Sequence, residues 1–343
     1  MKNVVKLWGA VLGGYPRSIH ARHEMRDLEK GESTYLSHEI NIALISSAVI
    51  GSQVASGLRY VTDGMLDFHD IFRPFLESWR NVSITGLLRY FDNNFFYRIP
   101  VFTAEPDIES FVWPQRIRAY SKVAYPSLIK AVIPGPLSLV LMGKNQSGLS
   151  KEDLAYSISS ILAMEAEKAE KAGAGMIQID EPILSDNEIT KEDADLAKDL
   201  ISNIAKRVNI PTTLSVYFDI PKKEVYEKLI DTKVKYISID AMDSPSRFLD
   251  LIKSQGFSDK KPILGLIDAR RIHDDDYNKI KEILINITKI ENEEIGVTTT
   301  TWFDVVPYNF AIRKTYLLGS YLEKIASELN AEFINPIKEV EKQ

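Results

Sequence analysis

Short apolar runs recur along the chain, and each ends in a polar residue, Gly or Pro before a longer amphipathic stretch. Such runs are typical of buried strands, and the amphipathic stretches are typical of helices packed over a sheet. The pattern predicts nine strands, at residues 11–15, 58–63, 83–90, 130–134, 175–180, 212–218, 235–240, 262–268 and 295–302.

Four of the intervening helices have recognisable first residues: Ser150, Thr190, Pro221 and Asp274. Ser150 and Thr190 are each followed three residues later by Asp, which is the spacing of a helix cap and its partner in the first turn. The first of these helices is expected to end at Gly173 and the second before Pro211.

This alternation of strands and helices predicts an α/β protein, a single (β/α)₈ TIM-type barrel formed by residues 1–343 as one domain. A doubly wound open sheet is the rival fold, but no strand is followed by a glycine-rich nucleotide-binding turn. Nine strands compete for eight places, so one belongs to an extra hairpin, either 11–15 or 83–90. The connection at about 91–127 is too long for a turn and is predicted to be a functional insertion.

The composition is that of a globular protein, with 45% hydrophobic and 26% charged residues. A net charge of −6 argues against a nucleic-acid surface and favours small molecules or proteins as partners. Residues 40–58 are the most lipid-like stretch, but polar residues recur through it, which predicts a buried helix and no membrane segment. The first residues lack a signal-peptide pattern, so we expect a cytoplasmic protein.

The chain contains no cysteine, which excludes disulfides, thiol nucleophiles and thiolate zinc sites. Its five histidines include one pair, His20 and His23, with a spacing that puts both on one helical face. A solvated basic helix explains that pair better than a metal site, so no metal bound by Cys or His is expected. A Gly-x-Ser-x-Gly nucleophile turn is also missing from the sequence.

Residues 175–182 read Gly-Met-Ile-Gln-Ile-Asp-Glu-Pro, an apolar strand that ends in two carboxylates. The C-terminal ends of barrel strands share one mouth, where the active sites of such barrels lie. We therefore take Asp180, Glu181 and Asp240 as candidate catalytic residues. The candidate binding residues are Arg17, Asp63, Asp92, Asn94, Gln178, Tyr217, Asp268, Arg270 and Trp302.

Acids that gather from several strands would repel one another, so such a mouth should hold a cation, either Arg17, Arg270, a ligand ammonium group or a metal. Asp219 and Asp304 follow two of the same strands. The alternative is that each Asp only caps the helix after its strand.

Two further segments suggest a ligand. The basic run from Arg17 to Arg26 follows a Gly-Gly-Tyr-Pro turn, and a helix start with adjacent arginines suits carboxylates or phosphates. Residues 90–97 interleave aromatic rings with Asp92, Asn93 and Asn94, which would suit a flat heterocycle. An aromatic cluster that merely seals the barrel rim explains that segment equally well.

Five stretches, in order, carry a family resemblance: Leu-Gly-Gly-Tyr-Pro-Arg-Ser at 12–18, Arg-Tyr-Phe-Asp-Asn-Asn-Phe-Phe-Tyr-Arg-Ile-Pro at 89–100, Ile-Pro-Gly-Pro at 133–136, Ile-Gln-Ile-Asp-Glu-Pro at 177–182, and Ile-Asp-Ala-Arg-Arg-Ile at 267–272. The chain resembles the cobalamin-independent methionine synthases, whose long form carries two similar barrels. The aromatic segment is more similar to the first of these barrels, which lacks zinc.

The resemblance implies methyl transfer from a methylated pterin to homocysteine. In the family's catalytic barrel, His, two Cys and Glu hold a zinc ion that keeps the homocysteine thiol as thiolate. This sequence has Leu-Ser-Val-Tyr at 214–217 in place of a His-x-Cys, Asp240 in place of the Glu, and Thr-Thr-Thr-Trp at 299–302 in place of the last Cys region. Asp180 matches a position that contacts the homocysteine amino group, and Arg17 would face the glutamyl tail of a pterin.

The resemblance therefore favours a zinc-less barrel that holds the methyl donor, or completes the site, beside a separate zinc-bearing catalytic barrel. Two alternatives are an autonomous methyltransferase with another acceptor, in which mutual repulsion raises the pKa values of the acids, and a binding barrel without chemistry.

Overall fold

A computed structural model describes residues 4–89, 94–291 and 293–342 of the chain. Its centre is a barrel of eight parallel strands that are hydrogen-bonded in chain order. The strands are β1 (Lys6–Gly9), β2 (Tyr60–Val61), β5 (Leu128–Pro134), β7 (Met176–Asp180), β8 (Thr212–Val216), β9 (Tyr236–Asp240), β10 (Lys261–Ile267) and β11 (Glu294–Thr299). A bridge between Ala10 and Tyr60 joins β1 to β2 and closes the ring, which confirms the predicted fold class.

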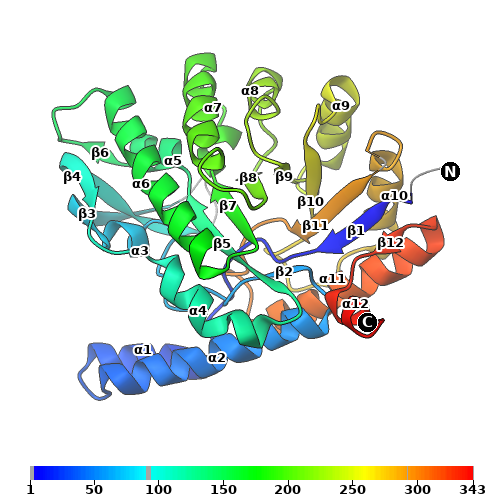
Figure 1. Ribbon diagram of the computed structural model, residues 1–343, viewed down its shortest axis with the longest axis horizontal. Helices are drawn as coiled ribbons and strands as arrows, with labels where there is room; N and C mark the ends of the chain where they lie inside the picture. Colours follow the sequence, from blue (N-terminus) through cyan, green and yellow to red (C-terminus); the bar gives the residue numbers. More distant parts are fainter. Residues whose placement is uncertain (1–3, 90–93, 292, 343) are drawn as a thin grey trace.

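Helices cover the outside of the barrel, as Figure 1 shows. The longer ones are α1 (Ile19–Glu29), α2 (Tyr35–Ala55), α4 (Trp113–Ala124), α6 (Lys151–Ala172), α7 (Lys191–Ala205), α9 (Pro245–Gln255), α10 (Tyr277–Ile287) and α11 (Tyr308–Leu329). The shorter ones are α3 (Arg73–Leu76), α5 (Pro136–Leu141), α8 (Lys223–Leu229), α12 (Pro336–Val340) and the 3₁₀ turn η1 (Pro182–Ser185). The two-residue strand β12 (Glu332–Phe333) pairs with the start of β1.

The predicted helix caps are present where the local signal was strongest. The Ser150 side chain accepts a hydrogen bond from the Asp153 N–H, and α6 ends at Gly173 in the left-handed conformation. Thr190 and Asp193 form a reciprocal capping box at the start of α7. The helices predicted to open at Pro221 and Asp274 begin two to three residues later, as α8 and α10, because Lys222 and Asp276 occupy their N-cap positions.

The extra hairpin is β3 (Trp79–Arg89) with β4 (Phe96–Ile108), an antiparallel pair outside the barrel to which β6 (Lys144–Asn145) adds. The prediction of an outlying strand near residues 83–90 is therefore confirmed, and β4 and α4 fill most of the long connection after it. The strand predicted at residues 11–15 is wrong, because the first barrel strand is β1 and residues 11–15 form a buried loop. An apolar loop and a buried strand have the same short hydrophobic pattern.

The interior of the barrel is apolar at its N-terminal end and polar toward its mouth. The Trp8 ring packs edge-on against Tyr60 and Tyr236, with centroid separations of 5.2 and 5.4 Å. Nearer the mouth, Lys130 and Gln178 are buried in the same interior. A polar interior layer is unusual for a barrel, whose core is normally filled by branched apolar side chains, so the polar residues mark the functional end.

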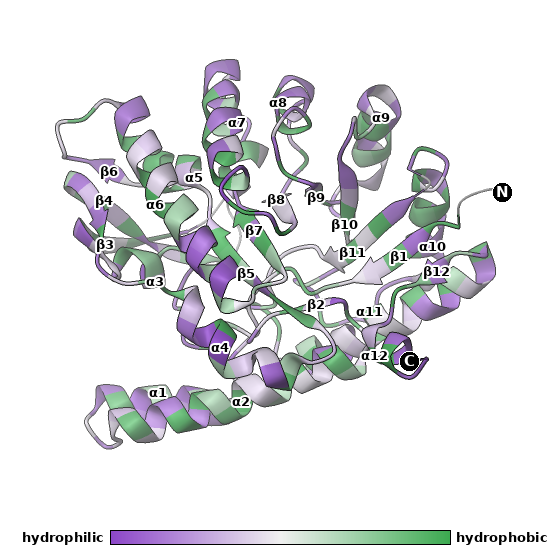
Figure 2. Ribbon diagram, viewed as in Figure 1, coloured by the Kyte–Doolittle hydropathy of each residue, from purple (hydrophilic) through white to green (hydrophobic). Residues whose placement is uncertain are grey.

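Figure 2 shows hydrophobic, green segments in the barrel strands, and the outer helices bury mostly apolar residues, such as Leu154, Ile158 and Leu162 of α6. Within the ranges that the structure describes, no helix combines the length and the apolar character that a membrane crossing requires.

Candidate functional site

Asp180, at the end of β7, is fully buried and accepts three hydrogen bonds from other side chains. Gln178 Nε2 donates to Oδ1 at 2.7 Å, and Tyr217 Oη and Trp302 Nε1 donate to Oδ2 at 3.1 and 3.0 Å. The two rings come from the loops after β8 and β11, so segments distant in sequence converge on this carboxylate. They also separate it from the open mouth of the barrel.

A buried lysine lies beneath this group. Lys130 Nζ donates to Gln178 Oε1 at 2.5 Å and to the Leu12 carbonyl at 2.9 Å. Burial raises the pKa of Asp180 and lowers the pKa of Lys130, while the attraction between the two opposes both shifts. Gln178 thus links an acid and a base inside the barrel and contributes no atom to the surface of the mouth cavity.

Glu181 caps a helix. Its carboxylate accepts hydrogen bonds from the N–H groups of Leu137 and Ser138 at the start of α5, at 3.0 and 2.5 Å. A Cβ atom on Gly135 would lie 2.2 Å from that carboxylate, which explains the glycine in the Ile-Pro-Gly-Pro stretch. Burial raises the pKa of Glu181 to about 7, and the nearby charge of Asp180 is the smallest of the causes.

Asp240, at the end of β9, is held in a similar way. It accepts hydrogen bonds from the N–H groups of Met242 and Asp243, and Arg270 Nη2 lies 3.3 Å from its other oxygen. Burial raises the pKa of Asp240 to about 7 despite the charge of Arg270. Asp268 accepts a hydrogen bond from the backbone N–H of Arg270 and fixes the turn that carries the guanidinium.

Asp63, after β2, has its own cation. Arg116 of α4 donates to Asp63 Oδ2 at 2.7 Å and binds Asp67 with two further bonds of 2.7 Å. The Met65 N–H donates to the other oxygen of Asp63. The strand-end acids therefore do not converge into one cluster as expected: each has separate donors, and burial rather than mutual repulsion raises their pKa values.

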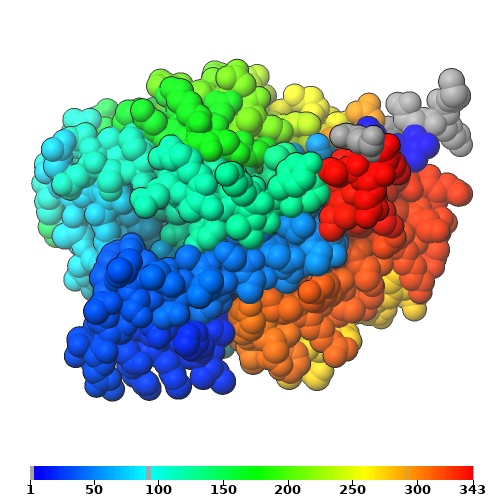
Figure 3. Space-filling view, turned by 60° about the horizontal axis from the view of Figure 1, so that its bottom comes forward, coloured from blue at the N-terminus to red at the C-terminus, as the bar shows by residue number. Residues whose placement is uncertain are grey.

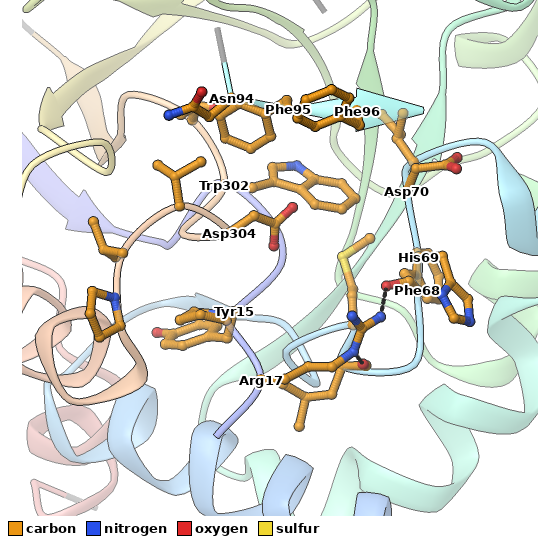
Figure 4. Close-up of a pocket in the computed structure, with 18 of the residues that line it drawn as sticks. Tyr15, Arg17, Phe68, His69, Asp70, Asn94, Phe95, Phe96, Trp302 and Asp304 are labelled. Atoms are coloured by element: carbon orange, nitrogen blue, oxygen red, sulfur yellow. Dashed lines mark hydrogen bonds between the residues drawn. The ribbon is translucent and has the colours of Figure 1, made fainter. Parts of the chain in front are cut away.

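The open part of the mouth is a cavity of about 490 Å³. Four of the predicted residues line it: Arg17, Asn94, Tyr217 and Trp302. Residues that the sequence did not single out complete the wall, among them Phe68, His69, Asp70 and Val306. In Figure 4, Phe95 and Phe96 lie on one side, Tyr15 and Arg17 on the opposite side, and Trp302 and Asp304 between them.

Charged side chains of both signs line the cavity, among them Arg17, Arg22 and Asp304. Arg17 donates to the carbonyls of Leu66 and Phe68 at 2.6 and 2.5 Å, which fixes the guanidinium in the wall (Figure 4). Asp304 is exposed to the cavity, and the surrounding protein raises its pKa to about 6 although the charge of Arg17 opposes this. At neutral pH the cavity therefore offers both carboxylate acceptors and guanidinium donors.

Asp70 is another charged wall residue, and it has a structural role as well. Its oxygens accept hydrogen bonds from the N–H groups of Phe72 and Arg73 at the start of α3 and from Arg98 of β4. These bonds attach the β3–β4 hairpin to the loop after β2. The sequence did not reveal Asp70, because it follows no recognisable strand. The one signal is its position shortly before the Arg-Pro pair that starts α3, where a helix cap would lie.

Backbone strain occurs in this wall. Phe218 and Met65 both line the cavity and both have positive φ angles, 84° and 50°. A residue with a side chain adopts such angles at a cost of about 1–3 kcal/mol, and strain of this kind clusters at ligand sites. The Phe218 ring packs against Phe95 of the hairpin loop, with a centroid separation of 5.3 Å.

The hairpin loop contributes Asn94, Phe95 and Phe96 to the cavity. Arg89 lies over the Phe96 ring and donates weakly to the Asn94 side chain at 3.4 Å. Asp92, also predicted to bind ligand, lies outside the described residues. The aromatic segment thus reaches the mouth, where its rings can both seal the rim and contact a planar ligand.

The positions that would hold zinc carry other chemistry. Ser215, Tyr217 and Trp302 offer no thiolate or imidazole, and Asp240 is engaged by Arg270 and two backbone amides. In the described part of the chain, no three His, Cys, Asp or Glu side chains are grouped so that they could hold a metal ion. A catalytic zinc needs three protein ligands and an open position, so these residues do not fit it.

Fold and site together define a (β/α)₈ barrel with a partly aromatic, charged cavity at its C-terminal mouth. Residues 78–292 match the family described as "Cobalamin-independent synthase, N-terminal domain", and the chain belongs to that family. The family resemblance seen in the sequence is thereby confirmed.

Curated relatives differ in length. A 5-methyltetrahydropteroyltriglutamate–homocysteine methyltransferase of Bacillus cereus is 27% identical over 271 residues, which are 77% of this chain but 33% of that protein. A methionine synthase of Saccharolobus islandicus is 26% identical over 282 residues, which are 82% of both chains. The chain therefore spans about a third of the Bacillus protein and most of the archaeal one.

Solved structures agree on the fold. A B12-independent methionine synthase of Shewanella, in complex with selenomethionine, has a TM-score of 0.78 at 17% identity and covers 94% of this chain and 98% of that one. A vitamin-B12-independent methionine synthase homologue from Listeria monocytogenes gives 0.75 at 18% identity, with 94% and 99% covered.

Proposed function

We propose that this barrel binds a methylated pterin in its mouth cavity and presents it to a separate zinc-bearing barrel that holds homocysteine. The observation that carries the proposal is the division of the mouth into two parts. One part is an open cavity with aromatic walls and charged side chains of both signs, and the other is a closed hydrogen-bond network where the zinc ligands would be.

The cavity has a size and chemistry that suit such a donor. Ligand pockets of about 300–1,000 Å³ with aromatic walls and few polar groups typically take drug-sized molecules, and this one is about 490 Å³. The Asp304 carboxylate can accept hydrogen bonds from the amino-pyrimidine edge of a pterin, and the rings of Phe95 and Phe218 can pack on its plane. Arg17 can bind a glutamyl carboxylate of the tail.

In the proposed reaction the methyl group leaves N5 of the pterin for the homocysteine thiolate of the other barrel, and N5 takes up a proton. The residues of this chain bind and orient the donor and exclude water from it. The acceptor is assigned to the partner because Trp302 and Tyr217 close off Asp180, the residue that the resemblance places at the homocysteine amino group.

A measurement of methionine formation by a zinc-bearing methionine synthase barrel from the same source, with and without this protein, tests the proposal. We expect a higher rate, or a lower KM for the methylated pterin, when this protein is added. An Asp304→Asn variant should lose most of the effect, whereas Asp186→Asn, a half-buried residue outside the cavity, should keep it. The proposal is wrong if the protein neither binds the zinc-bearing barrel nor changes its rate.

The raised pKa values of Glu181 and Asp240, both about 7, favour a second candidate, an autonomous methyltransferase with another acceptor. Groups with such values can act as general acids or bases near neutral pH. This candidate predicts turnover by the isolated protein that is lost in Asp180→Asn, and retained turnover in that variant would reject the site assignment. If no turnover is found, the remaining interpretation is a binding barrel without chemistry. In that case the strand-end acids serve only the partners that they already have within the protein.

A further inference from the structure

The surface of α2 carries a continuous apolar stripe. Six residues spaced three or four apart form it, and all six are exposed: Leu36, Ile40, Leu44, Ala48, Gly51 and Ala55. We call them the outer stripe. The three large residues are 66%, 52% and 65% exposed, and a Cβ atom on Gly51 would meet no atom within 4 Å.

The rest of α2 is also poor in charge. His38 and Glu39 are its only ionisable residues apart from the phenol of Tyr35, and both precede four uncharged turns. The opposite face packs on the protein, with Ile42, Val49 and Ile50 buried. A helix that is apolar on its outer face as well as on its packed face is normally covered on both, so a partner for the outer stripe is expected from outside this chain.

The stripe lies on an accessible face of the molecule. Figure 3 shows α2 in blue along the surface, between α4 in teal and α11 in orange, and nothing in this view covers it. Figure 2 shows α2 mostly in green and white along its length. Figure 1 places it at one edge of the molecule, beside α1.

The stripe is graded in size, with Leu and Ile in its first half and Ala and Gly in its second half. When two copies of α2 cross in antiparallel orientation about a two-fold axis near residue 46, Leu36 faces Ala55, Ile40 faces Gly51 and Leu44 faces Ala48 of the other copy. Each large side chain then meets a small one, as an isologous contact requires. We propose that a second copy of this chain docks there and that the protein is a dimer through α2.

The area and the charge are both compatible with this occupant. The outer stripe exposes on the order of 500 Å², against about 800 Å² buried per partner in a standard interface, and the flanking surfaces of α4 and α11 would supply the remainder. Each copy has a net charge of −6, but residues 40–58 contain no charged side chain. The two copies can therefore meet along this seam without like-charge repulsion.

The test is sedimentation equilibrium of the full chain, which should give about twice the 38.9 kDa of one copy. Gly51→Leu should weaken the dimer at least tenfold, because the new side chain meets Ile40 of the other copy. The same variant should keep the circular dichroism spectrum and melting of the parent, since position 51 faces open space in one copy. Adding Ile40→Ala to Gly51→Leu should restore dimerisation, because it returns a small residue opposite a large one.

Ser160→Leu is the matched control, an equally apolar change at an exposed position of α6, and it should leave the dimer unchanged. A monomer at all concentrations overturns the proposal, and so does a dimer that Gly51→Leu does not weaken. Capture of a zinc-bearing barrel or of lipid vesicles through the outer stripe, lost in Ile40→Glu, would assign the surface to that partner and also overturn it. None of these outcomes depends on whether the mouth cavity binds a pterin.

Discussion

The indole N–H of Trp302 donates a hydrogen bond of 3.0 Å to Oδ2 of Asp180, and so closes the end of β7 with a residue from the loop after β11. The glycines of the Leu-Gly-Gly-Tyr-Pro-Arg stretch lie against the same indole, where a Cβ atom on Gly13 would be 2.0 Å from Nε1. Two of the family stretches thus meet around one tryptophan. The consequence is a mouth with one closed half and one open half.

Replacing Trp302 by Phe should destabilise the protein by about 1–3 kcal/mol, because a buried carboxylate loses one of its three donors. The measurement is urea unfolding of four proteins: the parent, Trp302→Phe, Asp180→Asn and the double variant. If the bond is the cause, the double variant should lose less than the sum of the two single losses. Additive losses would show that the indole stabilises the mouth through packing alone.

Removing the Arg116 side chain should destabilise the protein by about 3–5 kcal/mol, because Asp63 would remain buried and charged without its cation. Arg116→Gln is the variant, measured by chemical denaturation. Arg80→Gln is the control, since Arg80 pairs with Asp107 on the surface and such pairs contribute at most about 1 kcal/mol. Asp63→Asn should recover part of the loss in Arg116→Gln, and equal losses in the Arg116 and Arg80 variants would contradict the role given to Asp63.

The stability contributed by Glu181 should fall as the pH rises from about 5 to about 7. Burial raises its folded-state pKa to about 7, so the folded protein keeps a proton that the unfolded chain has already released in this range. Each pH unit then lowers the free energy of unfolding by at most about 1.4 kcal/mol. Glu181→Gln cannot titrate at this position. The unfolding free energy of the parent minus that of the variant should therefore decrease toward pH 7. A difference that stays constant or grows over this range would refute the raised pKa.

Phe218 should contribute to ligand binding more than to folding. Its φ of 84° is strained, and its ring lies in the cavity wall. Phe218→Gly relieves the strain and removes the ring, so we expect binding of a methylated pterin to weaken by about tenfold, corresponding to about 1.4 kcal/mol, with a change in stability below about 1 kcal/mol. Tyr156→Ala, an exposed aromatic residue of α6, is the control for the titration. Undiminished binding in Phe218→Gly would place the pterin elsewhere.

Local signals in the sequence were enough to predict the barrel. Seven of the nine predicted strands overlap barrel strands, because each is an apolar run that ends at a turn signal close by in the sequence. The caps of α6 and α7 likewise depend on residues only three positions apart. The loop at residues 11–15 was mistaken for a strand because its burial depends on Trp302, almost 300 residues further along.

The site was less accessible to prediction because its contacts are long-range. Asp63 and its partner Arg116 are 53 residues apart, and Asp240 and Arg270 are 30 apart. Position at a strand end identified the acids but not the donors that satisfy them. The cavity itself is formed by loops, among them the one carrying His69 and Asp70, and loop residues have no periodicity that reveals a shared wall.

Donor binding by this barrel is tested by calorimetric titration of 5-methyltetrahydropteroyltriglutamate into the isolated protein, beside homocysteine and zinc. We expect the pterin to bind without zinc, to bind at least tenfold more weakly to Asp304→Asn, and to bind unchanged to Asp186→Asn. Homocysteine should not bind, because Trp302 and Tyr217 cover Asp180. Binding of homocysteine but not of the pterin would contradict the assignment of this barrel to the methyl donor.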